Sequence, residues 1–348
     1  MNKLNGLGLA LALATPAMAS AASPPPKPLF ASDDLIHLAI TGPISAIARS
    51  AEQSETPREA SLALAGTAEA YPIRLSARGI TRRLSVTCDF PPLRVEFTGA
   101  PPPSSLFQGQ RRLKLVTHCR QSPSFQQYVL LEYAAYRMFN LLTPISFRVR
   151  LATVDYVEPT GKVKLSRLGY LIEDTDDLAR RNGMQEAKTP DWIAATQLSP
   201  REAARTALFE YMIGNLDWSM RAGPVGQGCC HNSKLLAASP AATRFTPVPY
   251  DFDQSGLVNA PYAMPPEGIP VRSVLKRHYR GYCRHNGELI AAAAEIRARR
   301  GAMLATLGQI PQMDARTMRK AAAYLDGFFA DIASDQAVAA NLLKTCLN

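Results

Sequence analysis

LLEYAAYRMFNLLTPISFRVRLATVDYV, residues 130–157, contains the change of periodicity that decides the fold. Its first part places apolar side chains at spacings of four, three and four on one face of a helix, expected over about 124–142: Leu131, Ala135, Met138 and Leu142. Residues 146–157 and 162–173 have strand-like composition, and the Pro and Gly between them, at 158–161, are typical of a hairpin turn. The stretch therefore predicts a helix followed by a β-hairpin.

Strand patterns also dominate the sequence before this helix. Apolar runs punctuated by Pro and Gly occupy five further stretches: 35–42, 71–77, 82–88, 93–97 and 111–119. A Pro-rich run, SPPPKP at 23–28, is typical of an extended linker, and we place this linker at 20–34. The sequence thus predicts a β-rich N-terminal part over 35–175.

Helical patterns follow over 176–348. Ser199-Pro200-Arg201-Glu202 is a capping box that opens a helix, and Gly214 is expected to end it. Two or three Ala-rich helices are expected between about residues 288 and 347, with breaks near Pro311 and Ser334. Together with the strands before it, this helical part predicts the α+β fold class.

The first 19 residues have the pattern of a cleaved secretory signal. Lys3 supplies the positive charge, Leu7–Ala14 is a short apolar run, and Ala17-Met18-Ala19 is a typical cleavage motif. No later stretch approaches the roughly 18 apolar residues that a membrane-spanning helix needs. We therefore expect a secreted or periplasmic protein without a transmembrane span.

The chain is basic, with 39 Lys and Arg against 29 Asp and Glu and a formal net charge of +10. Such a balance favours anionic partners, including phosphates and anionic surfaces. The sequence has no zinc-finger pattern, no RNA-binding sheet signature and no long Lys/Arg run. A nucleic-acid partner is therefore not expected.

Six cysteines in an exported chain favour disulfide bonds, and six allow 15 complete pairings. We expect Cys88 and Cys119, which end two predicted strands, to be one pair. The sequence Cys229-Cys230-His231 is compatible with zinc binding or with structural cysteines. No second CxxC or HxxxH accompanies it, which favours the structural interpretation.

Three acidic residues in loops are candidates for chemistry. Asp217, in GNLDWSM (214–220), follows the predicted helix end and is either a catalytic base or part of an Asx turn. Asp251 and Asp253 alternate in PVPYDFD, and in an extended run they would lie on one side about 6.6 Å apart. Their repulsion, about 2.5 kcal/mol at a dielectric near 20, requires a neighbouring cation. That cation is either a bound metal ion or an arginine in a salt bridge.

Five further residues are candidates. The amide oxygen of Asn232 suits Mg²⁺, whereas His231 is a ligand, a base or a structural hydrogen-bond partner. Lys114 alternates with two leucines in RRLKLV, so it either binds phosphates or faces solvent. Glu132 is the expected partner of Lys114, and Arg94 is the rival cation.

The chain from about residue 78 to 253 resembles the CotH-type spore-coat protein kinase family, whose fold is atypical protein-kinase-like. The resemblance rests on 130–157 together with LGYLIEDTDDLARRNG (168–183), and on FEYMIGNLDWSM (209–220), HNSKLL (231–236) and PVPYDFDQSG (247–256). It implies two lobes, a β-rich N-lobe and a helical C-lobe with the catalytic and metal-binding loops.

The resemblance also implies a role for each candidate. Asp217 is implied as the base that accepts a proton from the acceptor hydroxyl. The residues implied to hold Mg²⁺ are Asn232, Asp251 and Asp253. The residues implied to serve the nucleotide are Lys114, Glu132 and Glu173, the last at the hinge between lobes. Asn232 follows Asp217 by 232 − 217 = 15 positions, against five in the protein-kinase loop, so residues 221–230 must fold away as an insertion.

We therefore expect a secreted, Mg²⁺-dependent, kinase-like phosphotransferase. It would move the γ-phosphoryl group of ATP or another nucleotide to a hydroxyl of a protein or a glycan. One alternative is a catalytically inactive, kinase-shaped binding or envelope-assembly protein, because the sequence has no glycine-rich phosphate loop and the cell exterior maintains no ATP. Another is a metal-dependent hydrolase that uses Asp217, His231, Asp251 and Asp253.

Overall fold

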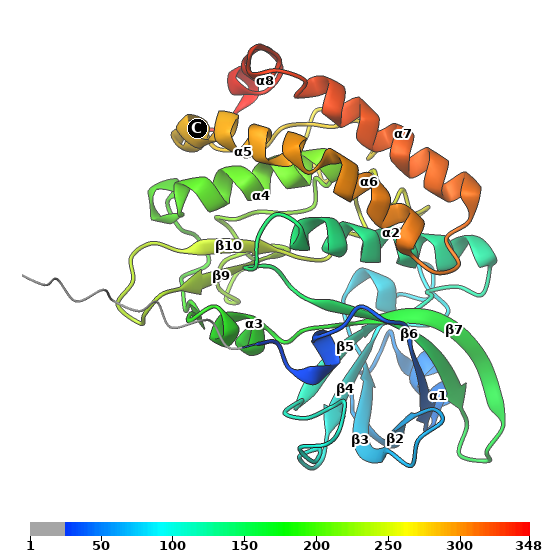
Figure 1. Ribbon diagram of the computed structural model, residues 1–348. Coiled ribbons are helices and arrows are strands. Elements are labelled where there is room, and N and C mark those ends of the chain that lie inside the picture. Colours follow the sequence, from blue (N-terminus) through cyan, green and yellow to red (C-terminus); the bar gives the residue numbers. More distant parts are fainter. Residues whose placement is uncertain (1–24) are drawn as a thin grey trace, which may run out of the picture.

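The computed structural model describes residues 25–348 and shows a mixed α+β protein, with a β-barrel and a set of C-terminal helices (Figure 1). The predicted signal sequence lies outside the described residues. Within 25–348 no helix is long and apolar enough to cross a membrane. Part of the predicted linker is packed: Leu29 and Phe30 in the short helix η1 (Pro28–Phe30) are buried against the barrel.

Seven strands form the barrel in the order β1-β2-β3-β4-β5-β7-β6. Their bounds are β1 (Ile36–Thr41), β2 (Arg58–Leu64), β3 (Ala70–Ala77), β4 (Leu93–Phe97), β5 (Arg112–Val116), β6 (Val149–Val157) and β7 (Val163–Ile172). Neighbours are antiparallel except β1 and β6, whose parallel pairing closes the ring. Alternating apolar side chains such as Leu38 and Ile40 fill its interior, as the period of a half-buried strand requires.

The structure differs from the sequence prediction at three places in the barrel. The predicted strand 82–88 is instead the short 3-10 helix η2 (Thr81–Arg83) followed by turns, and its aliphatic side chains Leu84 and Val86 are exposed. Strand β2 was not predicted because only Leu62 of its apolar residues is fully buried, so its pattern is weak. Helix α1 (Ile44–Ser50) was also missed.

The remaining elements are mostly helical. They are α2 (Pro123–Asn140), α3 (Thr175–Arg181), α4 (Pro200–Ile213), α5 (Asn286–Ala298), α6 (Arg300–Gln309), α7 (Ala315–Asp331) and α8 (Asp335–Asn341), with short 3-10 helices η3 (Ala195–Gln197), η4 (Cys283–His285) and η5 (Leu343–Thr345). A small sheet has the order β10-β9-β8, formed by β8 (Gln185–Glu186), β9 (Ser233–Ala237) and β10 (Thr246–Pro249).

The predicted helix boundaries are largely confirmed. Helix α2 covers the predicted 124–142 to within two residues, and Gly214 ends α4 in the left-handed conformation, with φ of 66°. Breaks near Pro311 and Ser334 are present, with a further break at Arg299. The capping box is not formed as predicted, because the Ser199 side chain makes no capping hydrogen bond.

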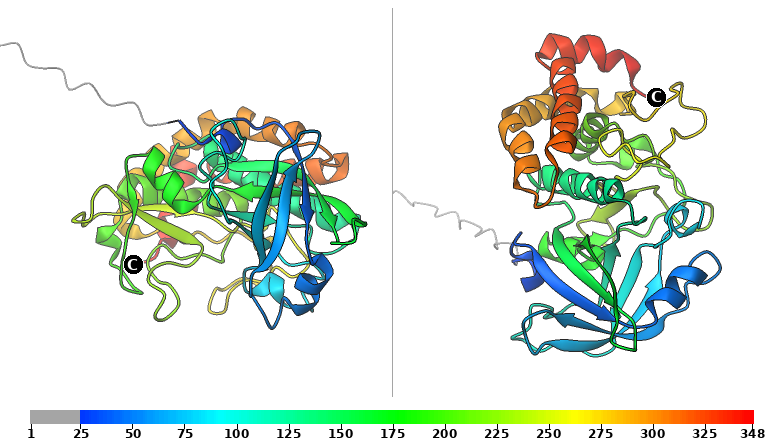
Figure 2. Two further views of the ribbon diagram at one scale, coloured as in Figure 1. Left: turned by 90° about the horizontal axis from the view of Figure 1, so that it is seen from below. Right: turned by 90° about the vertical axis from the view of Figure 1, so that its right-hand side faces the viewer.

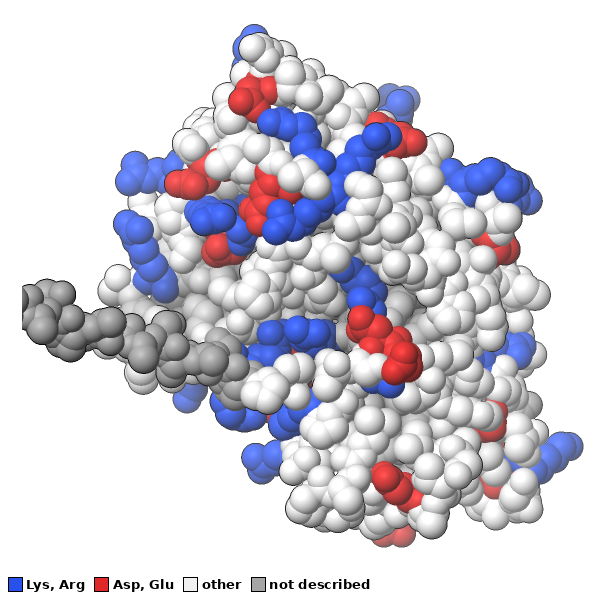
Figure 3. Space-filling model, in the orientation of Figure 1, with Lys and Arg blue, Asp and Glu red and all other residues white. Residues whose placement is uncertain are grey.

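Helix α2 lies between the barrel and the other helices (Figures 1 and 2) and contacts β6, β7 and α6. One hydrophobic core fills the barrel, and a second, larger core joins α2 to the helices and to the small sheet. The face drawn in Figure 3 carries Lys and Arg side chains in several groups, many of them beside carboxylates. The loops around β9 and β10 reach the junction of barrel and helices, where the candidate residues meet.

Candidate functional site

The loop after α4 presents Asp217. Its main-chain nitrogen donates to the Oδ1 atom of Asn215 at 3.1 Å, and the indole nitrogen of Trp218 donates to the Asn215 carbonyl at 3.0 Å. Arg280 also holds this loop, because its guanidinium donates to the carbonyls of Leu216 and Trp218, the latter at 2.8 Å. The Asp217 carboxylate therefore projects from a fixed turn and keeps about 31% of its side chain exposed.

Asn232 and His231 both bind the Asp217 carboxylate, although they are distant in the sequence. The Nδ2 atom of Asn232 donates to the carbonyl of Asp217 at 2.7 Å and to its Oδ2 atom at 3.1 Å. His231 Nε2 lies 2.8 Å from Oδ1. Antiparallel pairing of Ser219 with His231 closes residues 221–230 into an excursion, as the predicted insertion requires.

Asp251 is not extended, which corrects the prediction for PVPYDFD. Strand β10 ends at Pro249, and Asp251 has a φ of 65°, in the left-handed region that favours Gly, Asn and Asp. The main-chain nitrogen of Asp251 donates to the Tyr136 hydroxyl of α2 at 2.9 Å. Its side chain stays about 39% exposed, whereas Phe252 is fully buried as predicted. The preceding amide, of Tyr250, donates to the Asn232 carbonyl at 3.1 Å, so the two loops adjoin.

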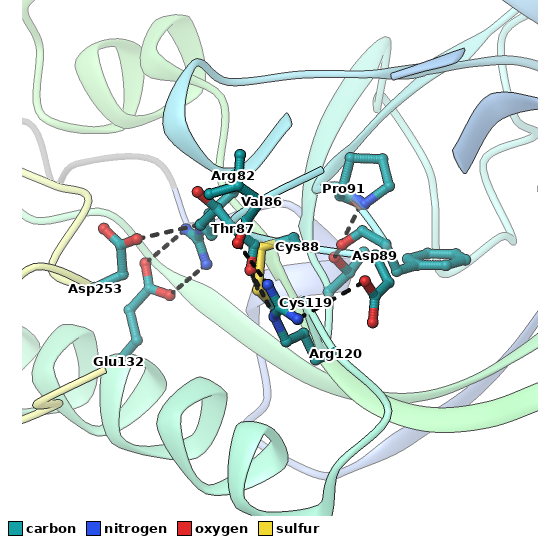
Figure 4. The surroundings of a disulfide bond; sticks show 12 residues. Arg82, Val86, Thr87, Cys88, Asp89, Pro91, Cys119, Arg120, Glu132 and Asp253 are labelled. Atoms are coloured by element: carbon teal, nitrogen blue, oxygen red, sulfur yellow. Dashed lines mark hydrogen bonds and ion pairs between the residues drawn. A yellow bond between two sulfur atoms is a disulfide. The ribbon is translucent and has the colours of Figure 1, made fainter. Parts of the chain in front are cut away.

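Arg82 unites the remaining carboxylates of the site (Figure 4). Its guanidinium donates to Glu132 at 3.1 and 3.4 Å, and lies 3.3 Å from Asp253 and 3.5 Å from Asp251. The predicted pair of Lys114 and Glu132 is therefore wrong: the partner of Glu132 is Arg82. The reason is the misjudged segment 82–88, which turns at η2 and directs Arg82 inward.

The three carboxylates of this cluster repel one another, and burial strengthens the repulsion. One carboxylate oxygen from each of Glu132, Asp251 and Asp253 lies within 4.8 Å of the others. At an effective dielectric near 20, each pair of charges repels by at least about 3.5 kcal/mol. Burial raises the pKa of Glu132 and Asp253, and the positive charge of Arg82 opposes that rise. Of the two compensating cations left open by the sequence, an arginine is the one that the described residues supply.

Lys114 borders the cluster from strand β5. Its ammonium lies 5.2 Å from the ring centre of Tyr250, and among the described residues it forms no ion pair. Burial lowers the pKa of Lys114 to about 8, with Arg78 and Lys234 adding to the effect and Asp251 opposing it. The rival Arg94 is exposed on β4. A half-buried ammonium that is destabilised by other cations is an arrangement that a bound anion would stabilise.

Glu173 is placed at the junction of β7 and α3, but its carboxylate is already engaged. It accepts hydrogen bonds from Arg181 at 2.8 and 3.0 Å and from the main-chain nitrogen of Arg148 at 3.0 Å. These bonds attach α3 to the end of the barrel. The structure thus brings six predicted residues to one region, whereas the Glu173 side chain belongs to a separate structural network.

Three residues of this region were missed from the sequence: Arg82, Tyr136 and Glu210. Tyr136 lies four positions after Glu132 on α2, which is the spacing of one helical face, so its proximity was predictable. Glu210 is fully buried in the last turn of α4, and burial raises its pKa well above the ordinary carboxyl value. No local pattern distinguishes Arg82 from other arginines.

All six cysteines are paired, as expected for an oxidising compartment and consistent with export. The predicted Cys88–Cys119 bond is present, Cys283 pairs with Cys346, and Cys229 pairs with its neighbour Cys230. These cysteines are therefore structural, and the zinc interpretation of Cys229-Cys230-His231 is not supported.

Comparison with solved structures finds a distant likeness. No protein family model matches the chain, and no curated protein matches it. Among solved structures, the chain is similar to the Helicobacter pylori proinflammatory kinase CtkA, with a TM-score of 0.37 and 11% sequence identity. The similarity covers 82% of this chain and 92% of that chain.

Proposed function

We propose that the protein is an Mg²⁺-dependent phosphotransferase that transfers a nucleotide γ-phosphoryl group to a hydroxyl of a protein or a glycan. The observation that carries this proposal is the meeting of Asp217, Asn232 and Asp251 through two adjoining loops. A partly exposed carboxylate near an amide oxygen and a second carboxylate is the set of groups that positions a hydroxyl and holds Mg²⁺.

Asp217 is suited to accept a hydrogen bond from the acceptor hydroxyl. Its Oδ2 atom is held by Asn232 and its Oδ1 atom by His231, so the carboxylate is oriented while part of it faces solvent. A carboxylate in this position orients the hydroxyl for attack and takes its proton as the new bond forms.

Asn232 and Asp251 fit the ligand requirements of Mg²⁺. Because the Nδ2 atom of Asn232 is used by Asp217, its Oδ1 atom remains as the ligand atom. Asp251 supplies a carboxylate whose contact with Arg82 is long, at 3.5 Å between Nη2 and Oδ1. Both are the oxygen ligands that Mg²⁺ prefers, and the ion would neutralise charge on the phosphates.

Lys114 and Arg78 are suited to bind the phosphates. Neither forms an ion pair with a described carboxylate, and after burial the charge of Arg78 is the largest cause of the lowered pKa of Lys114. Bound phosphate would reverse that shift, because an opposite charge favours the ammonium form. The phosphate cations of the proposal are therefore separate from the cation that binds Glu132.

Two measurements test the proposal. Nucleotide with Mg²⁺ at 100 times its dissociation constant should add about 2.7 kcal/mol to the free energy of unfolding. With a suitable acceptor, Asp217→Ala should reduce turnover at least about a hundredfold. Asp326→Ala, which changes an exposed carboxylate on α7, is the control and should leave turnover unchanged. Unaltered turnover in Asp217→Ala would remove this mechanism.

The inactive, kinase-shaped binding protein is the second candidate, and one observation favours it. Glu132 and Asp253, which the resemblance gives to the nucleotide and the metal, are both engaged by Arg82. The measurement of the free energy of unfolding with nucleotide and Mg²⁺ decides between the two functions. Absence of stabilisation at millimolar nucleotide, with Mg²⁺ present, would support the binding protein.

A further inference from the structure

The segment 78–92, which carries Arg82, is fastened to neighbouring parts of the chain by residues that follow Arg82. Arg83, the next residue, donates to the Ala51 carbonyl at 2.7 Å. Further along, the disulfide Cys88–Cys119 ties the segment to the end of β5, and Arg120 donates to the Thr87 carbonyl at 2.9 Å (Figure 4). Arg82 therefore enters the acidic cluster from a constrained segment.

Arg82 is well matched to the cluster. All three of its nitrogens face carboxylate oxygens: Nη1 and Nη2 bind Glu132, Nε lies 3.3 Å from Asp253, and Nη2 lies 3.5 Å from Asp251. The side chains of Arg82, Glu132 and Asp253 are at most 8% exposed, whereas Asp251 is 39% exposed. The planar guanidinium thus fills the buried side of the cluster and leaves the solvent side of Asp251 accessible.

We propose that Arg82 is a positioning residue that takes the place of a second divalent cation, so that the site holds one metal ion and not two. Glu132 and Asp253 bind Arg82, so Asp251 is the carboxylate of the cluster that remains to coordinate an ion together with Asn232. This inference rests on the proposed function for its one-ion site, but the exclusion of a second ion by Arg82 depends only on the charges of the cluster.

The charge balance supports this assignment. Three carboxylates and one guanidinium leave a net charge of −2 when all are ionised, which a single divalent ion balances. Without Arg82, the same carboxylates would carry −3 within 4.8 Å of one another, which favours uptake of a further cation. Removal of one positive side chain should therefore create a metal site.

The test counts bound Mn²⁺ by electron paramagnetic resonance, with and without an ATP analogue that is not hydrolysed. Wild-type protein with nucleotide should bind one ion. Arg82→Met should bind one more ion than wild type, in either condition, and Arg82→Lys should restore the wild-type count because it keeps the charge. Arg74→Met, which removes an exposed arginine of β3, is the control and should not change the count.

Two results would overturn the proposal: two ions in wild-type protein with nucleotide, or no additional ion in Arg82→Met that circular dichroism shows to be folded. Asp253→Asn covers the case in which Arg82→Met does not fold. The proposal requires its count to equal that of wild type, and loss of an ion would show that Asp253 is a metal ligand. If wild type binds neither nucleotide nor metal while Arg82→Met gains an ion, the proposed function fails and the role of Arg82 stands.

Discussion

The Nε2 atom of His231 lies 2.8 Å from the Oδ1 atom of Asp217. This hydrogen bond is the main reason that the pKa of His231 is raised above its ordinary value, although burial opposes the rise. When His231 is protonated, it donates to the Asp217 carboxylate and places a positive charge beside it. The pair therefore makes the proposed base sensitive to pH above the range in which an ordinary Asp titrates.

His231→Gln should change the pH dependence of kcat/KM. In wild-type protein, activity should increase as pH rises through a value above about 6.5, because His231 then loses its proton and Asp217 accepts one more readily. In the variant this increase should disappear. His37→Gln is a matched control, since His37 forms a similar 2.8 Å pair with Asp155 on the barrel. Coincident profiles for wild type and His231→Gln would contradict the prediction.

Lys114→Met should stabilise the protein while weakening nucleotide binding. A pKa lowered from 10.5 to about 8 shows that the folded protein disfavours the ammonium. The full shift corresponds to about 3 kcal/mol, and partial solvent access reduces the expected gain in the free energy of unfolding at pH 7 to about 1–2 kcal/mol. Chemical denaturation and nucleotide titration measure the two effects.

The Lys114 prediction also has a pH signature. Because the folded-state pKa is lower than the unfolded one, stability of the nucleotide-free protein should rise between about pH 8 and pH 10.5 and the rise should be absent in Lys114→Met. Lys320→Met, on the exposed side of α7, should change neither stability nor nucleotide affinity. A Lys114→Met variant that loses stability at pH 7 would show that the ammonium has a partner.

His118 should make the barrel sensitive to acid. Its ring is buried against Phe90, its two nitrogens have no partner among the described residues, and burial lowers its pKa from 6.5 to about 4. Because the unfolded chain takes up a proton at a higher pH than the folded protein, the free energy of unfolding should fall by about 3 kcal/mol as the pH decreases from about 6.5 to about 4. Above about pH 6.5 the ring is neutral in both states, and the full stability is present. Urea unfolding at several pH values measures this loss, which should be absent in His118→Phe. If the free energy of unfolding falls equally between pH 6.5 and pH 4 in both proteins, the prediction is refuted.

The helix, the hairpin and the loops were predictable because their signals are local. The apolar face of α2 and the αL stop at Gly214 depend on residues within a few turns of each other. The conformation of Asp251 was not predictable, because it depends on a hydrogen bond to Tyr136, which is 115 residues away in the sequence. A strand-like alternation after Pro249 was therefore misleading.

The cation of the cluster illustrates the same limit. Arg82 and Asp251 are separated by 169 residues, and nothing in RRLSVTC distinguishes an inward arginine from an exposed one. The stretch predicted as a strand, 82–88, contains the aliphatic residues Leu84 and Val86, and both are exposed in the structure. Lys114 was placed near the site because it alternates with buried leucines, but alternation indicates only a face of the sheet and not a partner.

The parallel contact between β1 and β6 has a consequence for behaviour outside the cytoplasm. A sheet that joins itself into a ring presents no strand with an unsatisfied row of amides and carbonyls to neighbouring molecules. Recruitment of a foreign strand, the usual first step of fibril growth, then requires the ring to open. For an exported protein, which works where ATP-powered chaperones are scarce, a closed sheet is a protection against aggregation.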